Sequence, residues 1–279
     1  MSCGCTPVRK RLENVGAVLP IVLLLGMLIV VPLIAVLAGA FSAGAGAVAA
    51  TLRDGAVRDA VLLSVAAAVV AVAFNAAFGL LAGWTIAKYR FAGKALLVTL
   101  IDAPLTVSPV IVGLAVLATL GQHTPAGAWL AAHGLRVAFA PAGVALATTL
   151  VTFPYVARAV IAQMTAHGRI YEEAALGLGA GPWQTFRRVT FPLARASFLN
   201  GLLICNARAL GEFGAVTVVS GNVRGLTQTI PLQIADFYDG ARVPAAFALA
   251  AALAAVAVIL ALTARLFARR DTSTKGLSA

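Results

Sequence analysis

Long apolar runs, separated by short polar segments, recur along the whole chain. Six of them are nearly uncharged and close to, or above, the roughly 20 residues that a membrane-spanning helix needs. They cover Ala17–Phe41, Val61–Ala87, Ala95–Leu120, Ala140–Ala157, Ala196–Ser220 and Pro244–Leu266. The pattern therefore predicts an all-α, polytopic membrane protein with six transmembrane helices.

Two of the six runs admit a second interpretation. The third is weaker than the others because it contains Asp102, Pro104 and Pro109, and Asp102 fits the start of a helix. The first follows a basic flank at Arg9–Arg11, as a signal peptide does. Its apolar run exceeds the about 7–15 residues of a signal-peptide core, so we expect a retained anchor.

The composition agrees with a membrane protein and excludes several other classes. The chain has 279 residues, of which 61% are hydrophobic and 11% charged, whereas soluble domains carry about 25% charged residues. A soluble enzyme, a disordered protein and a disulfide scaffold are thereby excluded. The three cysteines cannot form a disulfide framework, and we expect free thiols at Cys3 and Cys5. Scattered histidines at 123, 133 and 167 show no metal-ligand spacing.

The distribution of basic residues argues against nucleic acid and predicts a topology. A net charge of +11 invites a nucleic-acid interpretation, but the charges lie between the apolar runs. Fifteen Lys and Arg residues fall on one side of the predicted spans, five fall on the other, and Arg208 lies inside the fifth span. The basic side of a membrane protein faces the cytoplasm. We therefore expect both termini and a large loop at Arg158–Arg195 to be cytoplasmic.

These expectations divide the chain into four parts, with no linker or internal repeat between them. Residues 1–16 form a cytoplasmic tail, and 17–56 hold the first span and an external loop. Residues 57–267 form a transmembrane core with a cytoplasmic loop at 166–192, and 268–279 form a second tail. The sequence shows no P-loop, no catalytic pair of carboxylates and no Ser/His/Asp set. Energy must then come from a partner protein or an ion gradient.

The loop at 166–192 carries the strongest local signal. Good helix formers run to Leu178, with Glu172 and Glu173 near their start, where they complement the helix dipole. Glycines at 179 and 181 end that helix, and Pro182 suits the first turn of another, which Pro192 is expected to stop. The result is a compact knob in which Ala174 and Ala175 permit close approach of another protein. Trp183 and Phe186 can occupy a groove on that partner.

This loop resembles the signature segment of ABC importer permeases. The resemblance rests on Glu173, Ala174, Ala175, Gly179, Pro182, Val189, Phe191 and Pro192. The family prefers Ile and Leu where this chain has Val189 and Phe191, a mild departure that preserves apolar character. The resemblance implies the type I importer permease architecture, with a coupling loop that docks on a cytoplasmic ATPase. An ordinary amphipathic loop is the alternative.

The fifth span contains two charges at membrane depth. Arg208 lies 13 residues after Arg195, about 20 Å into a helix at 1.5 Å per residue, where a charge is costly and indicates function. Glu212 is four residues further on, so the two can pair. The pair can be a structural ion pair, a gate or a pathway lining. Pro109 and Pro154 are expected to break or kink the third and fourth spans, freeing backbone groups for a path.

A second resemblance narrows the family. The segments around Arg208–Gly214, Asp102–Pro109 and Thr152–Arg158 look like the sulfate, thiosulfate and molybdate group of permeases. An external loop with Asn222, Arg224, Thr227 and Thr229 is most similar to the W-type subunit of sulfate/thiosulfate permeases. The resemblance covers roughly residues 60–265, and the first 14 residues match nothing in it.

We therefore expect a non-catalytic permease subunit in a bacterial inner membrane that imports sulfate or thiosulfate. The resemblance implies a T-type permease as heterodimer partner, two ATPase subunits that use ATP and Mg, and a periplasmic anion-binding protein. No cofactor and no metal is expected on this chain itself. Two alternatives stay open: a molybdate or tungstate importer, and an ion-coupled secondary transporter that uses Asp102, Arg208 and Glu212 as a proton relay. The sequence does not separate a heterodimer from a homodimer.

Overall fold

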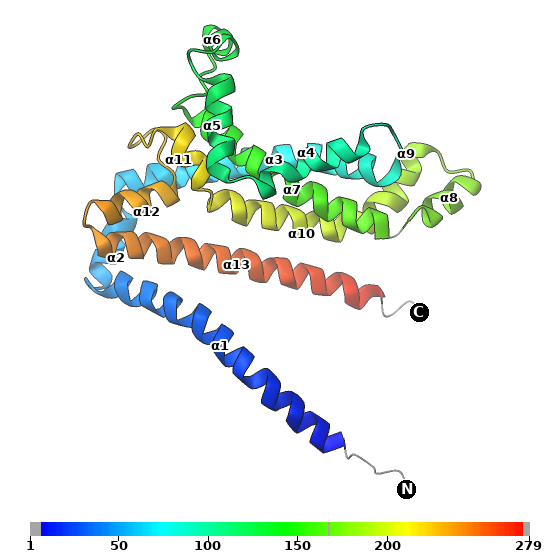
Figure 1. Ribbon diagram of the computed structural model, residues 1–279, viewed down its shortest axis with the longest axis horizontal. Coiled ribbons are helices and arrows are strands. Elements are labelled where there is room, and N and C mark those ends of the chain that lie inside the picture. Colours follow the sequence, from blue (N-terminus) through cyan, green and yellow to red (C-terminus); the bar gives the residue numbers. More distant parts are fainter. Residues whose placement is uncertain (1–6, 167, 276–279) are drawn as a thin grey trace.

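The chain is helical throughout in a computed structural model that describes residues 7–166 and 168–275 (Figure 1). The helices are α1 (Pro7–Phe41), α2 (Ala45–Leu52), α3 (Gly55–Lys88), α4 (Lys94–Thr106), α5 (Pro109–Leu120), α6 (Pro125–Ala132), α7 (Pro141–Ala166), α8 (Ile170–Gly177), α9 (Pro182–Thr185), the π-helix η1 (Phe186–Thr190), α10 (Phe191–Leu210), α11 (Gly214–Ser220), α12 (Ile230–Asp239) and α13 (Val243–Lys275). No strand occurs within the described ranges, and the all-α prediction is confirmed.

Four helices can cross a membrane without interruption, and two bent pairs can do so together. The uninterrupted stretches are Val22–Phe41, Gly55–Lys88, Pro141–Ala166 and Val243–Thr263. The bent pairs are α4 with α5, at 113°, and α9–α10 with α11, at 51°. Counting each pair as one span gives the six spans that the sequence predicts.

The third predicted span is not one continuous helix. Helix α4 ends before Val107, and both Val107 and Ser108 are extended, with ψ of 142° and 135°. For Ser108 this is the conformation that the proline directly after it imposes. Pro109 then occupies the first turn of α5, where its missing N–H costs nothing. Asp102 lies well inside α4, so the expectation that it begins a helix is wrong.

The fourth and fifth predicted spans also differ from the expectation. Helix α7 runs through the buried Pro154 and continues past Ala157 to Ala166, so Pro154 does not break it. Arg158 therefore lies in a helix and not at the start of a loop. In the fifth span, α10 ends at Leu210 and α11 begins at Gly214, which places the bend beside Glu212.

The centre of the bundle is the close contact of α3, α7 and α10. A Cβ at Gly83 of α3 would lie 2.7 Å from Val160 of α7, and one at Gly201 of α10 would lie 3.0 Å from Ala159. Small residues permit this approach, as they do between membrane helices generally. The amide of Asn75 joins the same three helices, since it donates to Thr152 at 2.9 Å and to the Cys205 sulfur at 3.4 Å.

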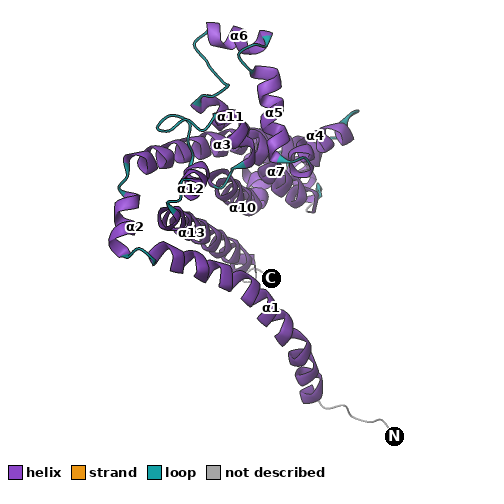
Figure 2. Ribbon diagram, turned by 60° about the vertical axis from the view of Figure 1, so that its left-hand side comes forward, coloured by secondary structure: helices purple, strands orange, loops and turns teal. Residues whose placement is uncertain are grey.

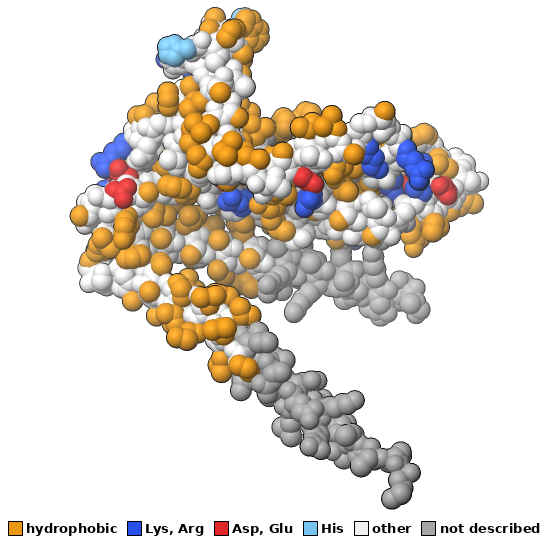
Figure 3. Space-filling view, viewed as in Figure 1, with side chains coloured by type: hydrophobic (Ala, Val, Ile, Leu, Met, Phe, Trp, Pro, Cys, Tyr) orange, Lys and Arg blue, Asp and Glu red, His pale blue; other side chains and the backbone are white. Residues whose placement is uncertain are grey.

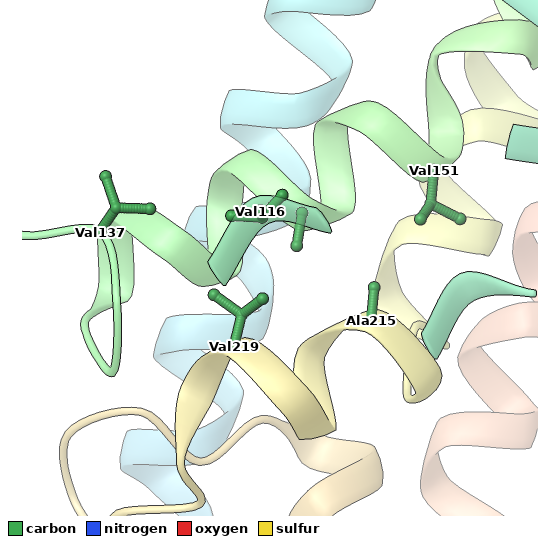
Figure 4. Packing of buried hydrophobic residues seen from close by; sticks show 6 residues of the cluster. Val116, Val137, Val151, Ala215 and Val219 are labelled. Atoms are coloured by element: carbon green, nitrogen blue, oxygen red, sulfur yellow. The ribbon is translucent and has the colours of Figure 1, made fainter. Parts of the chain in front are cut away.

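The second halves of the two broken spans pack on each other against α7. Figure 4 shows Val116 of α5, Val151 of α7, and Ala215 and Val219 of α11 converging in one apolar cluster. All four side chains are at least 96% buried. This cluster fixes α5 and α11 to the bundle although both leave the direction of the helix before them.

Helix α1 lies at the margin of the molecule and extends away from the bundle (Figure 2). It packs on α13 near its carboxyl-terminal end, where a Cβ at Gly39 would lie 2.5 Å from the Phe247 ring. Its apolar side chains from Val22 onward are largely exposed, as those of a helix surrounded by lipid or by another subunit are. Cys3, Cys5 and His167 lie outside the described residues.

Candidate functional site

The loop at 166–192 forms two short helices at a glycine corner. Helix α8 ends at Gly177, and Gly179 turns the chain with a φ of +87°, a value that L-residues rarely adopt. Gly181 then leads into Pro182, which takes the first turn of α9. In Figure 1 this knob lies at one end of the molecule, beyond the ends of α7 and α10.

The outer surface of the knob is apolar and exposed. Leu178 is 89% exposed, Ile170 74% and Trp183 70%. Ala174 is exposed beside them, and Ala175 is half-buried. The Glu173 side chain is 67% exposed and lies 4.0 Å from Arg169. Large apolar side chains that project together into water are typical of a protein-binding surface.

The carboxyl-terminal part of the loop corrects one expectation. Pro192 does not stop a helix, because the chain runs from α9 through η1 directly into α10. The Phe191 N–H donates to the Phe186 carbonyl, a π-type bond five residues back. This wider turn admits Pro192, which lacks the N–H that an ordinary α-turn uses. Val189 and Phe191 are half-buried on its inner side.

Aromatic side chains fix this segment to the membrane helices. The Phe186 ring lies 5.3 Å from that of Trp84 in α3 and 5.7 Å from that of Trp183. Phe191 continues the row at 6.2 Å from Phe186. Such pairs stabilise by about 0.5–1.5 kcal/mol beyond the area they bury. The knob and the amino-terminal end of α10 therefore share one aromatic cluster with the end of α3.

The charged bend comprises Arg208 at the end of α10 and Glu212 in the turn to α11. Their side chains are 3.3 Å apart, with Arg208 38% exposed and Glu212 1% exposed. The other carboxylate oxygen of Glu212 accepts a 3.1 Å hydrogen bond from the Ala215 N–H in the first turn of α11. Glu212 therefore caps α11 while it pairs with Arg208, and the sequence pattern does not reveal the cap.

The two bends in the broken spans touch each other. A Cβ at Gly214 would lie 3.1 Å from the Cβ of Pro109, and one at Gly113 would lie 2.6 Å from the Ala215 carbonyl oxygen. The structure thus brings Pro109 together with the Arg208–Glu212 bend. Pro154 lies buried in the body of α7 and takes no part in this contact.

The predicted external loop is held by its own hydrogen bonds. Thr227 is fully buried, accepts from the Val223 N–H and donates to the Ser220 carbonyl. Thr229 is also buried, at 4% exposure. Asn222 turns the chain at a φ of +53°, and Arg224 pairs with Asp236 of α12 at 2.6 Å. Thr227 therefore stabilises the loop, whereas the buried hydroxyl of Thr229 has no hydrogen-bond partner among the described residues.

Asp102 forms a second ion pair that the sequence does not predict. Both of its oxygens accept from the Arg158 guanidinium, at 2.6 and 2.8 Å, which joins α4 to α7. Its carboxylate is thus engaged away from Arg208 and Glu212, contrary to the proton-relay hypothesis. Figure 3 shows basic and acidic side chains in a row across an otherwise apolar face of the bundle.

A further contact that the sequence does not predict links the knob to α3. Lys88 lies 3.0 Å from Glu172, and the Thr190 hydroxyl donates to the same carboxylate at 2.6 Å. The sequence places Glu172 only near a helix start, where its charge complements the helix dipole. Its partners are invisible there because Lys88 is far away along the chain.

Comparison with known proteins gives the family. The family "Binding-protein-dependent transport system inner membrane component" matches residues 76–272, and the chain belongs to it. The resemblance seen in the sequence is confirmed.

Two kinds of sulfate permease, CysW and CysT, are similar to this chain and support the family assignment. The sulfate transport system permease protein CysW of Escherichia coli (strain K12) is 42% identical over 83% of this chain and 80% of its own. CysW of Synechocystis sp. is 40% identical over 84% of both chains. CysT of the same Escherichia coli strain is 35% identical over 69% of this chain and 70% of its own.

A solved structure shows the same fold. A chain of a bacterial alginate ABC transporter, in complex with its alginate-bound periplasmic protein, superposes with a TM-score of 0.76. The match covers 95% of this chain and 96% of that one at 20% identity. The type I permease fold is therefore confirmed, and the ion-coupled secondary transporter is excluded by family and fold together.

Proposed function

We propose that this chain is one permease subunit of an ATP-driven importer for sulfate or thiosulfate. The observation that carries the proposal is the exposed apolar knob of α8 and α9 in a chain of this family, since such a surface needs a partner on the water side. Relatives named as sulfate permeases support the substrate. Molybdate or tungstate is the alternative oxyanion.

The partners follow from the same reasoning. The chain pairs with a T-type permease, and two ATPase subunits bind ATP and Mg and dock on Glu173, Ala174, Ala175 and the Gly179–Pro182 corner. A periplasmic binding protein delivers the anion. This subunit performs no hydrolysis itself. Its location is the bacterial inner membrane, with both termini cytoplasmic, and its lateral surface faces lipid.

A continuous helical segment between the knob and the charged bend supports a mechanism in which movement of one is transmitted to the other. The segment from Pro182 to Leu210 is continuous and ends where Arg208 pairs with Glu212. A displacement of the knob by ATPase closure therefore moves the charged bend, which contacts Pro109 of the other broken span. We assign Arg208 and Glu212 to a gate in the anion pathway, where the half-exposed guanidinium can meet an oxyanion.

The topology is tested by reporters. A reporter fused after Lys275 is expected to be cytoplasmic, and one inserted near Gly127 in α6 external, because basic residues concentrate on one side of the spans. The structure supports a common side for both termini, since α1 begins and α13 ends toward the end of the molecule that carries α8 (Figure 1). An external reporter after Lys275 would contradict the orientation and the number of spans.

Reconstitution tests the function itself. The chain, its T-type partner, the ATPase and the binding protein are placed in liposomes, and uptake of radiolabelled sulfate is measured. We expect uptake that requires ATP inside, requires the binding protein outside, and is inhibited by thiosulfate. Omission of this chain is the control. Uptake inhibited by molybdate alone would favour the alternative oxyanion, and uptake driven by a proton gradient without ATP would refute the proposal.

A further inference from the structure

The carboxylate of Glu172 points toward the membrane helices, away from the exposed knob. One oxygen lies 3.0 Å from the Lys88 ammonium, at the last residue of α3. The other accepts a 2.6 Å hydrogen bond from the Thr190 hydroxyl, at the last residue of η1. The Lys88 and Glu172 side chains are only 9% and 14% exposed. One side chain of α8 therefore contacts both α3 and the segment that continues as α10.

Lys88 makes a second contact with the same part of the chain. Its ammonium also donates to the Gly168 carbonyl, two residues before α8 begins. The end of α3 thus holds the backbone that enters α8 and a side chain of its first turn. With little water around the pair, solvent screens the attraction less than it does at a surface.

Helix α8 lacks the apolar packing that usually fixes a short helix. None of its residues is buried. Amphipathic helices are normally held by an apolar face turned toward the core, but here Ile170 and Leu176 are exposed at 74% and 49%. A helix that presents its apolar residues to a partner needs another means of attachment. The polar contacts of Glu172 supply this attachment.

We propose that Glu172 is a positioning residue that transmits movement of α8 to α3 and α10. The inference rests on the proposed function, in which α8 docks on an ATPase. Within that function the adjacent glutamates have different tasks: the exposed Glu173 contributes to binding the ATPase, whereas Glu172, through Lys88 and Thr190, transfers the displacement to the membrane helices. We call Lys88, Glu172 and Thr190 the polar joint.

The reconstituted four-component complex separates these tasks. Glu172→Gln keeps the shape of the side chain but removes its charge, and Glu173→Gln is the matched control one residue away. Two quantities are measured: the amount of ATPase that stays bound to the permease, and the sulfate transported per ATP hydrolysed. For Glu172→Gln we expect normal ATPase binding and a transport ratio lowered about fivefold or more, the low end of typical coupling between sites.

Glu173→Gln is expected to do the reverse, with weaker ATPase binding and an unchanged transport ratio in complexes that assemble. A Glu172→Gln ratio equal to that of the wild type would overturn the polar joint. So would loss of ATPase binding without any change in the ratio, because Glu172 would then belong to the docking surface. Failure of the proposed function is distinct: the wild-type complex itself would bind no ATPase.

Two further variants apply if Glu172→Gln does not assemble. Thr190→Val removes one hydrogen bond from the joint at nearly constant volume, and Lys88→Arg keeps the cation. We expect the first to lower the transport ratio and the second to preserve it, which a general loss of stability does not produce. An unchanged ratio in Thr190→Val would overturn the inference.

Discussion

Replacement of Gly179 by proline is expected to abolish sulfate uptake without lowering the amount of permease in the membrane. Gly179 has a φ of +87°, whereas proline is confined to about −65°. The corner between α8 and α9 cannot form, so the exposed apolar face no longer fits the ATPase that we propose docks there. Proline also removes the N–H of Gly179, which donates to the Leu176 carbonyl at 2.9 Å. Nothing lies within 4 Å of a Cβ at this position, so a steric clash of the new side chain is not the cause.

The loop offers a matched control two residues away. Gly181 has a φ of −69°, which proline adopts without strain. Gly181→Pro is therefore expected to transport nearly as well as the wild type, although it places the same residue in the same loop. Gly179→Ala should fall between them, since an L-residue in the left-handed region costs about 1–2 kcal/mol. Normal uptake by Gly179→Pro would remove the corner from the mechanism.

The second large effect is expected at the charged bend, and it depends on which partner is removed. Arg208→Met leaves the Glu212 carboxylate 1% exposed and without its cation. Loss of one partner from a buried pair typically costs about 3–5 kcal/mol, so the level of folded permease should fall sharply. Glu212→Gln is milder, because the amide oxygen can still accept from the Ala215 N–H and the freed Arg208 reaches solvent.

The double variant Arg208→Met/Glu212→Gln separates stability from transport. With no charge left at the bend, the level of permease in the membrane should recover. If the pair gates the anion pathway, sulfate uptake per permease stays at background despite that recovery. Recovery of both quantities would show that the pair is only structural. The measurement is radiolabelled uptake divided by permease content for the wild type, the two single variants and the double variant.

Local chemistry made the knob and the bend predictable. Gly179 and Pro182 determine a helix end and a helix start from their own backbone properties, and the four-residue spacing of Arg208 and Glu212 places them on one helix face. The position of Pro109 indicated a break in the third span. In each case the residues that decide the structure lie within a few positions of one another.

Contacts between residues far apart in the chain could not be predicted from the sequence. The Asp102–Arg158 pair joins residues 56 positions apart, and the Lys88–Glu172 pair is still more distant along the chain. Nothing in a basic residue beside a span indicates which carboxylate will reach it. Charge counting therefore assigned Arg158 to a loop, and the helix-dipole argument gave Glu172 a purely local task. The first pair depends on the packing of α4 on α7, and the second on the position of α8 beside the end of α3.

The contact between Pro109 and Gly214 has a consequence for how the two broken spans can move. Each span has a hinge, and two independent hinges would allow the halves of α4–α5 and α10–α11 to reorient separately. Here the hinges lie against each other, since a Cβ at Gly214 would lie only 3.1 Å from the Cβ of Pro109. We therefore expect rotation at one hinge to displace the other. On this expectation the two half-helices α5 and α11 reorient together, and states in which one has moved alone are not populated.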